Sequence, residues 1–128
     1  GAMANWYNVA STTDAWAENV SPKTLDEGAD YSTFDSILTG KRDAWKIFLQ
    51  YAPRDMSKNK NRKVVTDVWG NATASSVAES ILQGCLEKAK RGELVFGTNT
   101  GTTGTVTGVR RNWIGSFTND DIIQALRA

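Results

Sequence analysis

Apolar residues in the middle of the chain recur with the spacing of an α-helix. Four of them stand three and four residues apart: Trp45, Phe48, Leu49 and Ala52. Residues spaced in this way share one face of a helix, so the pattern predicts an amphipathic helix over residues 42–52. Pro53 cannot continue a helix and disfavours helical geometry in the residue before it, so we expect the helix to end there.

A second helical pattern extends from Val77 to Cys85, where apolar residues stand four positions apart. Asn71 or Thr73 can cap such a helix, and Gly92 provides a stop signal. We therefore expect the longest helix of the chain from about residue 71 to about residue 91. Its buried side would carry Cys85 as a structural thiol rather than a reactive one.

The other segments before residue 92 carry weaker patterns. A short capped helix is expected over residues 15–17, and Pro22 suits the start of another turn. Residues 32–40 resemble a capping box followed by an apolar stripe that ends at a glycine. Residues 54–63 are polar and basic and are expected to form a loop. Residues 64–69 predict a short strand, with a helical turn as the alternative.

Residues 97–108 depart furthest from ordinary globular composition, with four glycines and six threonines in twelve positions. Glycine has no side chain and a buried threonine hydroxyl must be satisfied, so this segment cannot fill a core. Residues 94–96 and 109–114 predict two paired strands, with the Gly/Thr-rich segment as a long hairpin loop. The alternative is that residues 102–107 extend both strands into a protruding arm. Thr118 then caps a short terminal helix.

These patterns predict a mixed α+β fold: a mainly helical single domain over residues 5–128, with a C-terminal β-hairpin followed by a short terminal helix. Residues 1–4 are interpreted as a tag remnant with a start methionine and are left out of the fold prediction. A chain of 128 residues suits one hydrophobic core. No apolar run approaches the roughly 18 residues that cross a bilayer, so we expect no membrane contact.

The amino-acid composition excludes several kinds of catalytic and metal-binding site. The chain has no histidine and a single cysteine, which excludes histidine-based catalytic triads, histidine-ligated zinc and internal disulfides. No metal or cofactor is expected. The acidic pair Asp120 and Asp121 stands where a helix start favours negative charge. A histidine-free enzyme of unknown substrate therefore ranks third among the hypotheses, and we assign no catalytic residue.

Charge is unevenly distributed, although the formal net charge is only +1. Residues 1–40 hold six acidic residues and one lysine, a net charge of −5, whereas residues 41–63 hold eight basic and two acidic residues, a net charge of +6. This polarity suits two solvated faces of one fold, contact between subunits, or a partner site.

The second hypothesis is a nucleic-acid or phosphate-binding protein. Its candidate site residues are Lys58, Lys60, Arg62, Lys63, Arg110, Arg111 and Trp113. Proteins bind single-stranded nucleic acid through clustered cations, which contact the phosphates, and through aromatic side chains on which the bases stack. The glycines of residues 97–108 lack the spacing and the lysine of known phosphate-binding loops, which argues against a nucleotide cradle.

The leading hypothesis is a non-enzymatic interaction or assembly module that associates with itself or docks into a larger complex. Its candidate interface residues are Trp6, Tyr7, Thr102, Thr103 and Gly104. Tryptophan and tyrosine are favoured interface anchors, and oppositely charged blocks would orient a contact between subunits. The composition is also typical of small viral structural proteins. We expect an intracellular, cytoplasmic protein or a component of a virion.

Overall fold

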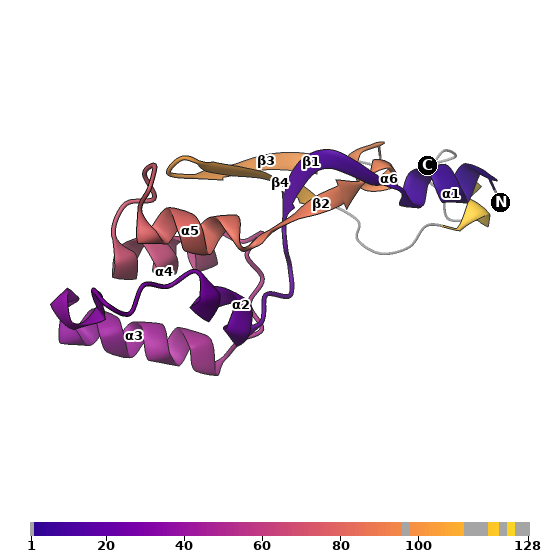
Figure 1. Cartoon of the computed structure of the whole chain (residues 1–128). Coiled ribbons are helices and arrows are strands. Elements are labelled where there is room, and N and C mark those ends of the chain that lie inside the picture. The colour runs from indigo at the N-terminus through magenta and orange to yellow at the C-terminus, as the bar shows by residue number, and fades with distance from the viewer. Residues whose placement is uncertain (1, 96–97, 112–117, 121–122, 125–128) are drawn as a thin grey trace.

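The computed structural model describes residues 2–95, 98–111, 118–120 and 123–124, and it shows a mixed α+β fold. In chain order these residues form the elements labelled in Figure 1: α1 (Ala2–Asn8), β1 (Ala10–Trp16), α2 (Pro22–Glu27), a 3₁₀ turn η1 (Phe34–Ser36), α3 (Thr39–Gln50), α4 (Asn59–Trp69), α5 (Val77–Gln83), β2 (Leu86–Lys90), α6 (Arg91–Val95), β3 (Thr98–Thr103) and β4 (Val106–Arg111).

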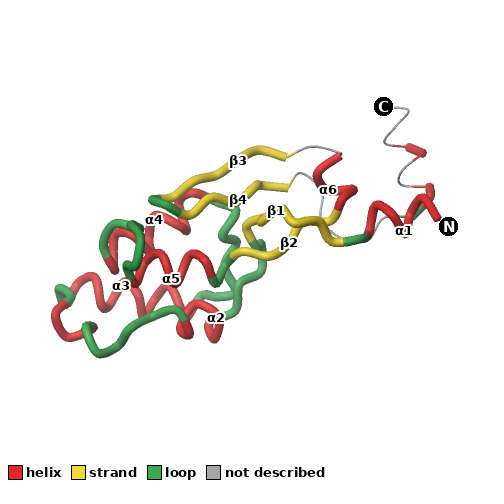
Figure 2. The backbone as a smooth tube through the Cα atoms, turned by 45° about the horizontal axis from the view of Figure 1, so that its top comes forward, coloured by secondary structure: helices red, strands yellow, loops and turns green. Residues whose placement is uncertain are grey.

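The elements are arranged along one direction. Helices α2 to α5 gather at one end, the sheet extends from them, and α1 and α6 lie at the other end (Figures 1 and 2). The described C-terminal residues lie beside α1, where the backbone N–H of Ala4 donates to Asn119 Oδ1 at 3.2 Å. Among the described residues, no helix is both long and apolar enough to span a membrane.

The sheet has the strand order β2-β1-β4-β3. β1 pairs antiparallel with β2, and β3 pairs antiparallel with β4. The two hairpin-like pairs join through a short parallel contact in which Ala15 lies opposite Val109. This order places β3 at one edge of the sheet.

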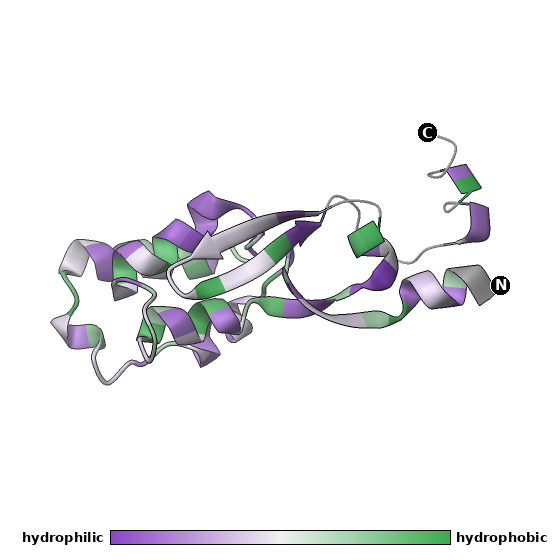
Figure 3. Cartoon of the chain, turned by 90° about the horizontal axis from the view of Figure 1, so that it is seen from above, coloured by the Kyte–Doolittle hydropathy of each residue, from purple (hydrophilic) through white to green (hydrophobic). Residues whose placement is uncertain are grey.

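The core lies between the helices and the sheet. Its largest fully buried side chains include Trp16 from β1, Trp45 from α3 and Ile81 from α5. Figure 3 shows apolar positions interleaved with polar ones on the helices, whereas β3 carries no apolar residue along its length. The sheet edge at β3 is therefore held in place by means other than a hydrophobic face.

Three sequence predictions in this region are confirmed. The helix expected over residues 42–52 is α3, and it buries Trp45 and Phe48. Pro22 begins α2, where the Ser21 side chain caps the first turn by accepting from the Thr24 backbone N–H at 3.2 Å. Cys85 is fully buried, and burial raises the pKa of its thiol to about 12.

Four local predictions before residue 92 are wrong. No helix forms over residues 15–17, because Ala15 and Trp16 end the strand β1, which pairs with β2. The stripe over residues 32–40 is only the short turn η1, and its glycine lies in the first turn of α3. The loop predicted over residues 54–63 ends at residue 58, because residues 59–69 form α4. The strand predicted over residues 64–69 is wrong, and its helical alternative is confirmed, since Val65 and Val68 share a buried helical face with two polar residues.

The helix expected from residue 71 to residue 91 is also wrong. It is the short helix α5, which ends at Gly84, followed by the strand β2. Pairing with β1 determines the strand, because Ala15 and Trp16 lie opposite Glu87 and Leu86. A single-sequence pattern carries no information on such a partner, which lies about 70 positions away.

The C-terminal hairpin differs from its prediction. Residues 94–95 end α6 instead of forming a strand, and residues 98–108 of the Gly/Thr-rich segment form β3, the turn and the first half of β4. The connection is a two-residue turn at residues 104–105, not a long loop. Residues 96–97 and 112–114 lie outside the described residues, as does most of the predicted terminal helix.

Candidate interaction site

Alternating threonines build the hairpin of β3 and β4. β-branched residues favour extended backbone, and the two strands pair in continuous register from Thr98 opposite Arg111 to Thr103 opposite Val106. A two-residue turn needs a backbone that L side chains rarely adopt, and Gly104 supplies it with a φ of +60°. The glycines and threonines of residues 98–108 are therefore suited to a tight hairpin.

The inner face of the hairpin is fastened to the helices by Arg62. This α4 residue is only 4% exposed, and its Nε donates to Thr103 Oγ1 at 2.9 Å. Its Nη1 donates to the carbonyl oxygens of Met56 and Ser57, both at 2.9 Å. Its guanidinium lies over the ring of Trp16, 4.6 Å from the ring centroid. Burial above all lowers the pKa of Arg62.

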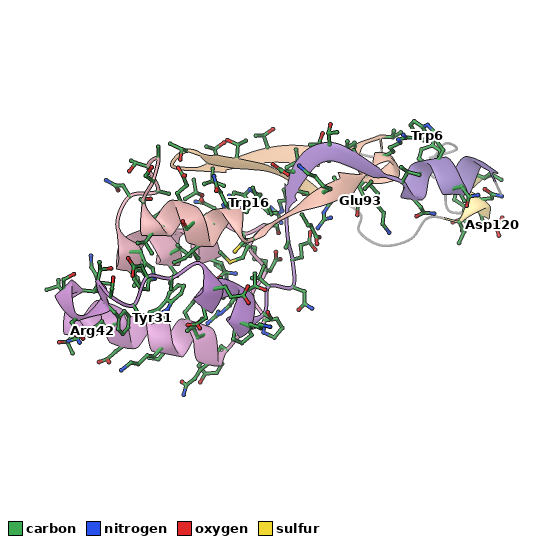
Figure 4. The ribbon with its side chains drawn as sticks, in the orientation of Figure 1. Trp6, Trp16, Tyr31, Arg42, Glu93 and Asp120 are labelled. Carbon is green, nitrogen blue, oxygen red and sulfur yellow. The ribbon has the colours of Figure 1, made fainter. Side chains whose placement is uncertain are left out.

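Trp16 extends the same attachment into the sheet. Figure 4 shows this residue between the strands and the helices, and its Nε1 donates to the carbonyl oxygen of Gly101 at 2.9 Å. A Cβ on Gly101 would lie 2.9 Å from Arg62 Nη2 and 3.2 Å from Trp16 Nε1. Only glycine lets β3 lie this close to both side chains.

The tip of the hairpin is docked on the loop before α5. The backbone N–H of Thr105 donates to the carbonyl oxygen of Ala72 at 2.7 Å, and its hydroxyl donates to Glu79 Oε2 at 2.6 Å. A Cβ on Gly104 would lie 1.9 Å from that same Ala72 oxygen. The described part of the Gly/Thr-rich segment thus neither projects as a free arm nor covers a pocket.

Arg111 closes the other end of the hairpin. Its side chain is 4% exposed and pairs with Glu93, which is 1% exposed, at 3.4 Å, and with the half-exposed Glu87 at 2.5 Å. Glu93 also accepts the backbone N–H of Lys90 at 2.7 Å, and Figure 4 shows it near the α6 end of the sheet. The Arg111 Nη2 that contacts Glu87 also donates to the carbonyl oxygen of Trp16 at 3.3 Å. These bonds hold β4 against β1, β2 and α6.

Among the residues that the structure describes, the outer side of β3 has no such partners. The residues of an antiparallel strand turn their N–H and C=O groups alternately toward and away from the paired strand. Thr103 closes the turn opposite Val106, so the backbone groups of Thr98, Thr100 and Thr102 point to the open side. No described residue makes a backbone hydrogen bond to them there, and Figure 2 shows β3 as the outermost strand.

The side chains of β3 also carry no group that would prevent pairing with another strand. Thr100 and Thr102 are exposed, and β3 contains neither a charged residue nor a proline. On the outer face the Thr102 hydroxyl lies 3.1 Å from that of Thr107 on β4. Natural edge strands are usually blunted by charges, prolines, bulges or a covering element, so this edge is open for pairing with another strand.

The predicted interface residues take different positions. Thr102 lies on the open edge, but Thr103 and Gly104 make contacts inside the chain. Trp6 and Tyr7 lie at the far end on α1, with ring centroids 5.0 Å apart, and Arg91 stacks over the Trp6 ring (Figure 4). The structure does not bring the two groups together.

The predicted basic site is likewise divided. Lys58, Lys60 and Lys63 are exposed around the first turns of α4, and Arg110 is exposed on β4. Arg62 and Arg111 are buried in the internal contacts described above. Trp113 lies outside the described residues. The basic residues therefore do not form one surface, because two of the strongest donors are used to hold the hairpin.

Sequence reasoning missed Thr98 and Thr100 as edge residues. The alternation of β3 held a signal for them, since residues two apart share a face and a backbone direction. Within the described ranges no group of three side chains could hold a metal ion. Comparisons with protein families, curated proteins and solved structures find no match to this chain.

Proposed function

We propose that this chain is a non-enzymatic assembly module that acts by strand addition at β3, with the β3 of a second copy as its partner. One observation carries the proposal. The backbone groups of Thr98, Thr100 and Thr102 face the open side of an uncharged edge strand and have no backbone partner among the described residues.

Two β3 strands paired antiparallel about Thr100 would place Thr98 of each copy opposite Thr102 of the other. Three such pairs form about six backbone hydrogen bonds. Each is worth roughly 0.5–1.5 kcal/mol net, and the loss of translational and rotational freedom offsets part of the sum. The sum is about 3–9 kcal/mol, and the cost of association is at least about 4 kcal/mol. At the favourable end about 4–5 kcal/mol remains, which corresponds to a dissociation constant of about 0.2–1 mM, so assembly through this edge depends on protein concentration.

The anchoring of the hairpin supports the proposal. Arg62 and Trp16 hold the inner face, and Ala72 accepts the backbone N–H of the tip. A strand that is already ordered loses little conformational freedom when it pairs. Neutral side chains also avoid like-charge repulsion between identical strands.

Binding of nucleic acid or a phosphate ligand ranks second. It retains Lys58, Lys60, Lys63 and Arg110 as exposed cations, but internal contacts occupy Arg62 and Arg111. Exposed lysines are common on solvated helices, so these lysines alone do not indicate a binding site. Strand addition is preferred because it accounts for the unprotected edge.

A matched pair of variants tests the proposal. Thr100→Lys places two like charges directly opposite each other at the centre of the proposed contact. Thr107→Lys adds the same charge to the same exposed face, but on the internal strand β4. In sedimentation velocity over a range of concentrations, Thr100→Lys should raise the dissociation constant at least tenfold, whereas Thr107→Lys should change it less than threefold.

Two results would overturn strand addition. One is a wild-type protein that stays monomeric at millimolar concentration. The other is an equal effect of the two lysines, which would place the contact on the face of the hairpin rather than at its edge. Circular dichroism of both variants confirms that each remains folded.

A further inference from the structure

We propose that a groove between α3 and α4 binds an acidic amphipathic helix of a partner protein, with Arg54 pairing with one of its carboxylates. This surface belongs to the helical end of the molecule and is independent of the β3 edge. The argument rests on the apolar lining of the groove, on the way Arg54 is held, and on the charge around it.

The groove is shallow and mainly apolar, with a volume of about 320 Å³. Its lining residues are Ala44, Ile47 and Phe48 from α3, Asn61 and Val64 from α4, and Arg54 from the connection between the two helices. Ile47 is 53% exposed, and Tyr51, which follows the last residue of α3, is 72% exposed. A partner helix typically binds by covering large apolar side chains that lie beside such a groove.

Arg54 is held in place from three directions. Its backbone N–H and C=O both pair with Val20, each at 2.9 Å. Its guanidinium lies over the Phe48 ring at 4.4 Å from the centroid, and its Nε donates to the Phe48 carbonyl oxygen at 3.0 Å. The side chain therefore enters the groove with little freedom left to lose.

The two terminal nitrogens of Arg54 are still available. No described residue accepts a hydrogen bond from them, and no described carboxylate lies within ion-pair distance of this guanidinium. An arginine with a prearranged pair of N–H groups matches a carboxylate in a bidentate geometry. The most specific polar contact offered by the groove is thus to an anionic group.

Charge around the groove selects the same kind of partner. Lys41 lies one turn before Ala44 on α3, and Lys60 lies one turn before Val64 on α4. Two exposed acidic residues are also close by, because Asp43 lies one turn before Ile47 and Asp67 one turn after Val64. Both lysines are exposed, and residues 41–63 carry a net charge of +6. Complementary potential favours an acidic partner and repels a basic one.

The apolar floor favours a helix over other acidic partners. α3 has twelve residues and is therefore about 18 Å long, which matches a partner helix of about three turns. Such a helix presents apolar residues at three- and four-residue steps to the floor and acidic residues to the rim. A nucleic acid would use the cations and leave Ile47 and Val64 uncovered.

A designed peptide provides the test. The probe is a labelled 15-residue helical peptide with leucines at four-residue and three-residue steps and glutamates beside them. Its control has lysine at each glutamate position. Fluorescence anisotropy should show binding of the acidic peptide at submillimolar concentration and at least tenfold weaker binding of the basic one. Methyl resonances of Ile47 and Val64 should shift on titration.

Variants assign the contact to Arg54. Arg54→Met retains most of the apolar contact with Phe48 but loses the charge, and it should weaken binding at least tenfold. Lys46→Met removes the same charge from an exposed α3 position that does not line the groove, and it should change affinity less than threefold. Ile47→Ser removes an exposed apolar side chain outside the core and should also weaken binding.

The outcomes that overturn the proposal are distinct. They are no binding of the acidic peptide at 1 mM (about −4 kcal/mol), equal binding of both peptides, or shifts confined to residues outside the groove. Tighter binding of a labelled 15-nucleotide single strand than of the peptide would assign the surface to nucleic acid instead. If Arg54→Met fails to fold, Ile47→Ser and the comparison of the two peptides still decide.

Discussion

The docked tip of the hairpin leaves no room for a side chain at Gly104. Gly104 has a φ of +60°, and an added Cβ would lie 1.9 Å from the Ala72 carbonyl oxygen and 2.5 Å from the Ala72 Cβ. Gly104→Ala therefore brings both a disfavoured backbone conformation and a collision with backbone. Gly40→Ala makes the same chemical change in α3, where a Cβ meets nothing within 4 Å.

The two alanine variants should change stability in opposite directions. A left-handed conformation costs alanine about 1–2 kcal/mol. Moving the tip away from Ala72 also removes the hydrogen bond from the Thr105 N–H, worth about 1 kcal/mol. Gly104→Ala should thus lower the free energy of unfolding by roughly 2–3 kcal/mol. Gly40→Ala should raise it by about 0.5–1 kcal/mol, because alanine has the higher helix propensity.

Urea denaturation followed by tryptophan fluorescence measures both changes, since the chain contains five tryptophans. The slope of the transition should stay constant, so that the shift in midpoint reports stability. A Gly104→Ala protein as stable as the wild type would refute the docked tip. Equal destabilisation by the two variants would refute the distinction between the two sites.

Three further variants, one of them with a matched control, test buried side chains. Arg62→Met should lower the free energy of unfolding by about 3 kcal/mol in urea denaturation, because it leaves two buried carbonyl oxygens without their charged donor. Its control, Lys63→Met, changes an exposed lysine and should keep the free energy of unfolding within about 0.5 kcal/mol of the wild-type value. Glu93→Gln should cost about 3 kcal/mol in the same measurement, since it leaves the buried Arg111 short of negative charge. The raised pKa of Cys85, about 12 against an ordinary 9.0, keeps the thiol protonated, so a thiol-reactive dye at pH 8 should label only the unfolded protein. Above pH 9 the unfolded chain loses the thiol proton first, so stability should fall as the pH rises toward 12, and Cys85→Ala should lack this component.

The regular part of the fold could be predicted because its signal is local. α3 repeats apolar residues at helical steps, and the residues counted as apolar are the ones it buries. α4 hides the same signal, because its buried face includes Asn61 and Arg62. The partners that satisfy Arg62 include Thr103, which lies 41 positions away. No window of sequence shows that a charged residue will find such partners.

The candidate site could be predicted only in part. The composition excluded residues 97–108 from the core, but Val106 of this segment is 3% exposed and belongs to the core. Alternation places Thr102 and Thr103 on opposite faces of a strand. Which face is free depends on Arg62, Trp16 and Ala72, none of which is near in sequence. The open edge itself follows from the strand order, which the sequence does not reveal.

Hydrogen exchange at β3 tests the central claim most directly. The amides of Thr98, Thr100 and Thr102 face the open side in the single chain, whereas those of Asn99, Gly101 and Thr103 bond to β4. Exchange measured residue by residue at micromolar and at near-millimolar concentration should show the first set becoming protected as concentration rises and the second set unchanged. Rates for the first set that stay equally fast at both concentrations would contradict assembly through β3.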